Sequence, residues 1–169
     1  KGDAFDFYAK TGASANAYTG FVRTCYVFGA TDHLDESLDV LLDFVSHPWF
    51  TEATVAKEQG IIGQEIRMYE DSPDWRLMFA VFDCLYHNCP LKVDIAGTVE
   101  SISEITPALL YTCTDAFYNP GNMVLAAAGK ITREQILAAL DRADLPAGGE
   151  VGQKIPFAEP REIVRPADR

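Results

Sequence analysis

Two glutamates seven positions apart, Glu58 and Glu65, have the greatest chemical potential in this sequence, because their segment shows a helical apolar period. At about 100° per residue, Glu65 returns to within about 20° of Glu58 on a helical wheel. Ile62 and Ile66 fall on this side, whereas Gln59 falls further round, where solvent is expected. Both carboxylates are therefore predicted inside the apolar stripe, where each needs a metal, a cation or hydrogen bonds.

The spacing alone leaves two interpretations of this pair open. One is a metal or catalytic site, and the other is a pair of buried glutamates satisfied by arginine or backbone N–H groups. Gly60 and Gly63 interrupt the same helix, where each glycine costs about 1 kcal/mol relative to alanine. We expect these glycines to allow another backbone to approach closely.

Two short strands precede this helix and are predicted to form a hairpin. A helix over Ala4–Lys10 ends at Gly12. Alternating residues then predict strands at Ala13–Tyr18 and Val22–Phe28, joined by a turn at Thr19-Gly20-Phe21.

Helical periodicity dominates the rest of the chain. An amphipathic helix from Leu34 to Val45 takes Asp32 as its N-cap, and the glutamate helix runs from about Glu52 to Tyr69. A third helix is predicted from Asp74 to Tyr86, and it is buried because it is apolar on nearly every side. The next helix begins at Thr106-Pro107, and its predicted inward residues are Leu109, Leu110, Cys113, Ala116 and Phe117. A buried strand follows at Met123–Ala128, and a last helix begins with a capping box at Thr132–Gln135 and ends near Ala143.

This order of elements predicts an α+β fold, with an antiparallel-rich sheet and helices packed on one face. A mostly helical bundle with an attached hairpin is the alternative. We expect one domain over residues 1–145 and a Pro/Gly-rich linker or tail over residues 146–169.

Composition narrows the classes of partner. The 169 residues are 48% hydrophobic and 23% charged, with a formal net charge of −11, which argues against nucleic acid or an anionic membrane as main partner. No apolar run is long enough to span a bilayer, and the N-terminus is not typical of a signal peptide.

The sequence opens at Lys1 without Met, which indicates a trimmed or partial chain. Four cysteines without scaffold spacing predict free thiols and a cytoplasmic location.

Two lesser candidate sites contain histidine. Cys84, His87 and Cys89 form Cys-x-x-His-x-Cys, which lacks a visible fourth metal ligand, so core cysteines are the favoured interpretation. His47 is predicted to interact with a helix C-terminus rather than with a metal.

Four segments resemble a known family in its own order. The run from Glu58 to Arg76 resembles the downstream glutamate helix of the M16 (pitrilysin/insulinase-type) zinc metallopeptidases, in their bacterial zinc-peptidase branch. Gly12–Thr19, followed by Arg23-Thr24-x-Tyr26, looks like that family's active-site edge strand. Ala96–Ile102 and Phe117–Met123 also match, so the resemblance covers about residues 1–145.

The resemblance implies a role for each matching residue. In this family, two histidines of an inverted His-x-x-Glu-His motif and one downstream glutamate hold zinc, and that glutamate corresponds to Glu65. Glu58 corresponds to a companion glutamate with a supporting catalytic role. Asn16, Ala17 and Tyr18 correspond to the strand along which an extended peptide substrate pairs by β-augmentation. The implied fold is an M16-like α/β roll, truncated here.

The chain departs from the family in its histidines. His33, His47 and His87 lie outside any such motif, which is expected just upstream of Lys1. We therefore expect a fragment of a zinc endopeptidase that is inactive alone, with zinc bound in the complete protein and a second M16-like domain or subunit as partner. The alternative is a non-catalytic M16-like partner or binding subunit.

Overall fold

The computed structural model describes residues 4–149 and 158–159, which divide into two compact units. The first unit contains Lys1–Thr51 and Pro107–Gly152, and the second contains Glu52–Thr106 and Gln153–Arg169. The Glu52–Thr106 part of the second unit therefore lies between the two parts of the first unit along the sequence. In the described part of the chain, no helix has both the length and the apolar character needed to cross a bilayer.

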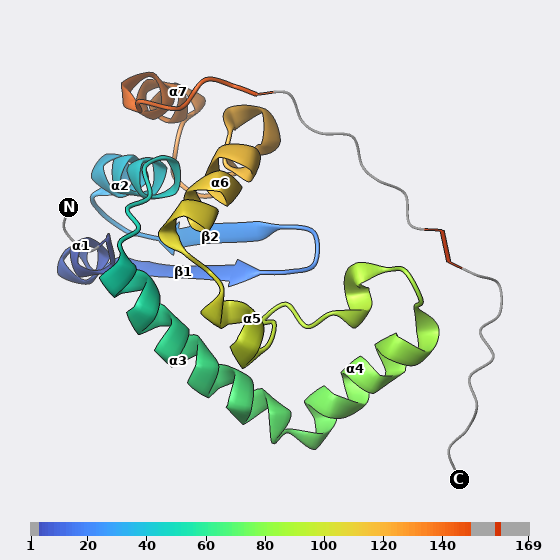
Figure 1. Cartoon of the computed structure of the whole chain (residues 1–169). Coiled ribbons are helices and arrows are strands. Elements are labelled where there is room, and N and C mark those ends of the chain that lie inside the picture. Colours follow the sequence, from blue (N-terminus) through green and yellow to red (C-terminus); the bar gives the residue numbers. More distant parts are fainter. Residues whose placement is uncertain (1–3, 150–157, 160–169) are drawn as a thin grey trace, which may run out of the picture. The chain divides into compact units, whose positions relative to one another are not determined.

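The first unit is built on a hairpin with helices against one of its faces (Figure 1). Its elements are α1 (Ala4–Thr11), β1 (Ser14–Thr19), β2 (Thr24–Gly29), α2 (Leu34–Ser46), α6 (Pro107–Phe117), the 3-10 helix η2 (Pro120–Asn122) and α7 (Arg133–Arg142). The strands pair antiparallel, with Ser14 opposite Gly29 and Thr19 opposite Thr24. These features confirm the predicted α+β class, its antiparallel hairpin and the helices on one face.

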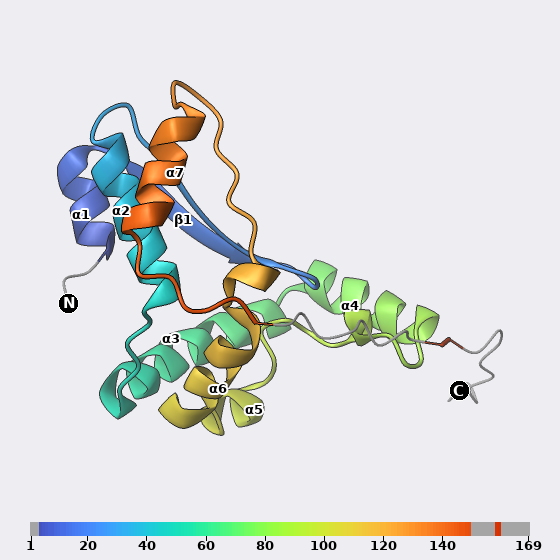
Figure 2. The same ribbon diagram turned by 90° about the horizontal axis from the view of Figure 1, so that it is seen from above.

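The core of the first unit joins α2 to α7, which lie side by side in Figures 1 and 2. Leu38 and Leu42 of α2 pack on Ala139 of α7, with Phe28 of β2 against the same cluster. The predicted capping box is present, because Thr132 accepts from the Gln135 N–H and the Gln135 side chain accepts from the Thr132 N–H. The helix start is thereby defined at the position that brings Ala139 to α2.

Tyr8 attaches α1 to this core. Its ring stacks on Phe28 at 5.7 Å, and its buried hydroxyl donates to the Ser37 carbonyl at 3.0 Å. Gly12 follows α1 with φ 71°, a left-handed conformation that glycine adopts without strain. The predicted glycine stop is confirmed.

The second unit is helical. It comprises α3 (Glu52–Glu70), α4 (Pro73–Leu85), the 3-10 helix η1 (Pro90–Lys92) and α5 (Val99–Ser103). As predicted, Ser72 caps α4 and Pro73 occupies its first turn, with the Ser72 hydroxyl accepting from the Trp75 N–H. The sequence did not predict α5, which carries its own capping box between Thr98 and Ser101.

Three predictions about burial and strands are wrong. Met123–Ala128 is exposed and forms no strand, because a strand needs a pairing partner and β1 and β2 are the strands of the described part. No residue of α4 or α6 is fully buried, and Leu77 is 65% exposed. The described residues cover the apolar faces of these helices only in part, and Leu109, Cys113, Ala116 and Phe117 are exposed rather than inward.

Two local boundaries also differ. The N-cap of α2 is His33, with φ 53°, because the Asp32 carboxylate accepts the His33 N–H instead of capping the helix. The hairpin turn is Gly20–Arg23, which begins one residue later and ends two residues later than predicted, and the Gly20 N–H donates to the Arg23 carbonyl at 2.8 Å.

Candidate functional site

The buried face of α3 includes Ile66, as predicted, but it is rotated toward Gln59 and away from the two glutamates. Val55, Gly63 and Ile66 are its buried residues. Gln59, expected toward solvent, donates its side-chain amide to the carbonyls of Ile102 at 2.8 Å and Ile105 at 3.0 Å. These hydrogen bonds satisfy carbonyls at the C-terminal end of α5, so they draw the Gln59 side of α3 inward.

Glu58 and Glu65 are consequently exposed, which corrects the prediction that both lie buried in an apolar stripe. Their surroundings are still partly apolar, since Ile61 and Met68 lie on the same side of α3 and are 48% and 60% exposed. The glutamates therefore form an acidic and apolar surface that the described residues leave uncovered.

Tyr69 holds the carboxylate of Glu65. The tyrosine hydroxyl donates to Glu65 Oε1 at 2.9 Å, one helical turn away. This hydrogen bond, together with the negative charge of Glu65, raises the pKa of Tyr69. Glu65 is thus an accessible carboxylate in a defined orientation.

Tyr69 is itself positioned by neighbours outside α3. Its ring stacks on Trp75 of α4 at 4.5 Å with an interplanar angle of 17°. The Trp75 indole N–H donates to Asp94 Oδ2 at 2.6 Å, and Asp94 Oδ1 accepts the Ala96 N–H. The i, i+4 spacing of Glu65 and Tyr69 is the sequence signal from which this contact could have been predicted.

The glycines of α3 do not serve the predicted purpose. A Cβ on Gly60 would meet nothing within 4 Å, and a Cβ on Gly63 would lie 3.8 Å from the Ile102 side chain. Within the described residues neither glycine is required for the approach of another backbone.

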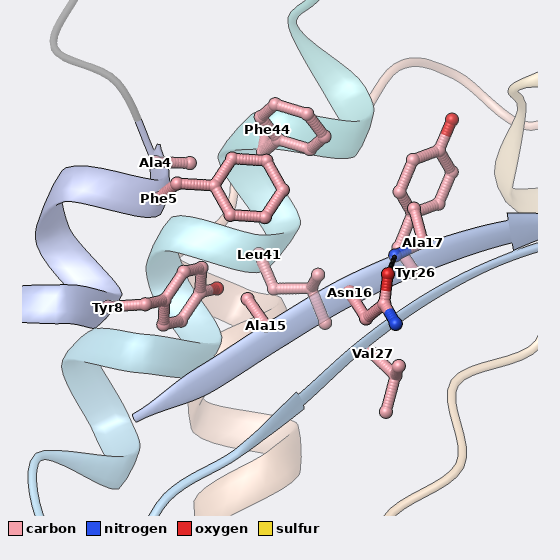
Figure 3. Close-up of a pocket in the computed structure, with 10 residues that line it drawn as sticks. All are labelled: Ala4, Phe5, Tyr8, Ala15, Asn16, Ala17, Tyr26, Val27, Leu41 and Phe44. Atoms are coloured by element: carbon pink, nitrogen blue, oxygen red, sulfur yellow. Dashed lines mark hydrogen bonds between the residues drawn. The ribbon is translucent and has the colours of Figure 1, made fainter. Parts of the chain in front are cut away.

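The segment predicted to bind substrate lies on β1, and the outer edge of this strand carries polar backbone groups. Gly20 and Arg23 form a hydrogen-bonded pair across the turn. In an antiparallel ladder, hydrogen-bonded and non-hydrogen-bonded pairs alternate, so Ala17 lies in a non-hydrogen-bonded pair and its N–H and C=O point away from β2. The Asn16 side-chain oxygen accepts the Ala17 N–H at 2.8 Å, as drawn in Figure 3. In the described part of the chain, β1 pairs with β2 alone.

The two faces of β1 differ. Ala15 and Ala17 line a small apolar hollow together with helix residues that include Phe5, Leu41 and Phe44 (Figure 3). Tyr18 alternates onto the other face, 53% exposed, and its hydrogen bond with Cys25 raises its pKa.

Tyr26 of β2 connects the hairpin to a distant part of the first unit. The Tyr26 and Tyr118 hydroxyls share a hydrogen bond of 2.8 Å, and this bond connects β2 to the residue just after α6. Burial, followed by this hydrogen bond, raises the pKa of Tyr26. The strand opposite Ala17 is therefore held in place by a residue 92 positions away.

A catalytic zinc requires three protein ligands and an open position. Glu65 is suited to be one of them, because its exposed carboxylate is already oriented by a hydrogen bond, as metal-ligating carboxylates usually are. The described residues bring no three His, Cys, Asp or Glu side chains together as a complete metal site. Cys84 and His87 are exposed, and His47 is the C-cap of α2, 3.1 Å from Asp43.

Comparisons with known proteins identify relatives of this chain. Residues 3–99 match the family model described as Insulinase (Peptidase family M16). The Bacillus subtilis protein named uncharacterized zinc protease YmfH is 54% identical over 97% of this chain and 36% of its own length. YmxG of the same organism, also named a zinc protease, is 33% identical over 77% of this chain and 31% of its own length.

A solved structure shares the fold. The crystal structure of a protein from Alicyclobacillus acidocaldarius, described as an M16-like peptidase, has a TM-score of 0.81 and 39% identity. The match covers 88% of this chain and 36% of that one. The present chain spans about a third of the length of the curated relatives it matches.

Proposed function

Because the chain belongs to the insulinase family of M16 peptidases, we propose that it forms part of a zinc-dependent endopeptidase that hydrolyses peptides in extended conformation. The observation that carries this proposal is the exposed, oriented carboxylate of Glu65 on α3. Its relatives are named zinc proteases, which supports zinc as the metal.

Glu65 is the proposed zinc ligand of this chain. When bound, zinc would supply a Lewis acid that polarises a peptide carbonyl and lowers the pKa of a water molecule. Tyr69 restricts the rotation of the Glu65 carboxylate and leaves it accessible. Glu58, two helical turns earlier and exposed on the same side, has the proposed supporting role.

Asn16, Ala17 and Tyr18 are the proposed substrate-binding residues. A peptide that adds to the outer edge of β1 would pair with the backbone groups of Ala17, which recognise main chain rather than particular side chains. The Asn16 side chain occupies the Ala17 N–H. An incoming peptide carbonyl would displace it, so Asn16 satisfies this donor until substrate binds.

The remaining parts of the proposal concern the whole protein. We propose that the isolated chain does not cleave peptides, that two histidine ligands and a second M16-like domain or subunit complete the site, and that the protein acts in the cytoplasm. The four cysteines, all free, support the reducing location.

The test uses a protein of the length of its relatives that includes these residues. We expect it to bind about one zinc per molecule and to cleave an unstructured peptide. Glu65→Gln should abolish zinc binding and cleavage, and Glu58→Gln should retain zinc and lower the rate of cleavage. Glu70→Gln, a control on the same helix, should retain both activities. A full-length protein that neither binds zinc nor cleaves peptides would instead identify a non-catalytic M16-like partner.

A further inference from the structure

The chain that follows α4 makes an unusual set of backbone hydrogen bonds. The C-cap residue Tyr86 is extended, with φ −119° and ψ 136°, and the next three N–H groups all donate to one carboxylate, that of Glu159. His87 N–H donates to Oε2 at 2.6 Å and Asn88 N–H donates to Oε1 at 2.9 Å, while Cys89 N–H also donates to Oε1. Both carboxylate oxygens are therefore bound.

A side chain adds a second point of recognition. Asn88 Nδ2 donates to the carbonyl oxygen of Ala158 at 2.7 Å. The three N–H groups bind the charged carboxylate of Glu159, and the Asn88 side-chain amide binds the backbone carbonyl of the preceding residue. The contact is specific for a carboxylate at the right distance from a peptide carbonyl, rather than for any nearby negative charge.

The electrostatics favour an ionised carboxylate. Partial desolvation raises the pKa of Glu159, but the hydrogen bonds from His87, Cys89 and Asn88 outweigh it, so the net shift is downward. Consecutive N–H groups form an anion-binding concavity, and hydrogen bonds to an ionised acceptor are about twice as strong as neutral ones.

We propose that the backbone amides of His87–Cys89 and the Asn88 side chain form a carboxylate-binding clasp whose occupant is the chain's own Ala158–Glu159. The clasp attaches Ala158–Glu159 to the residues just after α4, about 70 positions away along the sequence. It also gives a role to His87–Cys89, whose N–H groups and Asn88 side chain bind this segment. This inference does not depend on the proposed peptidase activity.

The clasp is exposed, so its occupancy can be measured by amide exchange. In the 169-residue chain, NMR hydrogen exchange should show protection at His87, Asn88 and Cys89. Glu159→Gln should raise exchange at these three amides about tenfold, with an unchanged circular dichroism spectrum. Glu162→Gln, three residues further along, is the matched control and should leave their exchange unchanged.

Two results would overturn the proposal. One is unchanged exchange in Glu159→Gln, and the other is an equal loss of protection in Glu162→Gln, which would show a diffuse effect of charge. A peptide of residues 154–164 added to the Glu159→Gln chain should shift the three amide resonances. Asn88→Ala should weaken that binding, whereas an acetate effect equal to that of the peptide would contradict the claim that Ala158–Glu159 is the specific occupant.

Discussion

The hydroxyl of Tyr69 donates a hydrogen bond to the carboxylate of Glu65 across 2.9 Å, and the ring of Tyr69 stacks on Trp75. The proposed zinc ligand is thus oriented from α4 as well as from its own helix. Outer hydrogen bonds of this kind usually contribute 10–100-fold to metal affinity.

Tyr69→Phe tests this relationship, because it removes the hydroxyl and retains the ring. In a protein of the relatives' length, we expect zinc affinity to fall about 10–100-fold in a chelator competition assay. The urea unfolding midpoint should change little, since the lost hydrogen bond is exposed. Tyr86→Phe is the control, and an equal loss of zinc affinity in that variant would contradict a specific role for Tyr69.

In the 169-residue chain the same pair can be tested without metal. Since Glu65 raises the pKa of Tyr69, Glu65→Gln should lower the pKa of Tyr69 toward its usual value, as followed by NMR of the labelled tyrosine. An unchanged Tyr69 titration would show that the hydrogen bond is absent in solution.

Ala17→Pro tests the outer edge of β1. Proline removes the one N–H of Ala17, which points away from β2, so the β1–β2 ladder should survive. We expect a folded hairpin by NMR and, in a full-length protein, weaker binding of an extended peptide. Tyr18→Pro should instead disrupt the hairpin, because the alternation places its N–H in the ladder. Unchanged peptide affinity in folded Ala17→Pro would argue against strand addition here.

Gly60→Ala should stabilise the chain. The position is exposed, mid-helical and open, so alanine removes the entropic disadvantage of glycine without a clash. We expect the free energy of unfolding in urea to rise by about 0.5–1 kcal/mol. Gly12→Ala is the opposite control, because its φ of 71° strains any other residue. A destabilised Gly60→Ala chain would indicate that another element needs this space.

Alkaline pH should destabilise the first unit through Tyr8. Burial raises the pKa of Tyr8 from 10.0 to about 12. Because the folded chain holds this proton more tightly than the unfolded chain, the stabilisation is complete below pH 10 and is lost as pH rises through about 12. Urea midpoints measured across this range should fall less steeply for Tyr8→Phe, and an identical slope would contradict the assignment.

Local patterns predicted much of the fold. The hairpin, the burial of Leu38 and Leu42, the Ser72 cap and the Thr132 capping box all depend on residues close in sequence, and the structure confirms them. These signals are strong because backbone hydrogen bonds and helical periodicity act over a few residues.

The orientation of α3 was not predictable in the same way. Which side of α3 is buried depends on the bonds from Gln59 to carbonyls near Ile102, 43 residues away, and α5 itself was missed. The periodicity also did not reveal that the described residues cover the apolar sides of α4 and α6 only in part, because a pattern predicts an apolar face but not its partner. The assignments of Glu58, Glu65 and Asn16–Tyr18 to catalysis and binding remain predictions.

The interruption of the first unit by Glu52–Thr106 has a consequence for synthesis of the chain. The hairpin joins residues at most 15 positions apart, so it can close as soon as it leaves the ribosome, within about 1–10 µs. Leu42 must instead wait for Ala139, which is made roughly 5–20 s later at ordinary elongation rates. During that interval the part of α2 that packs on α7 has no partner, so this apolar surface stays exposed on the nascent chain until α7 emerges.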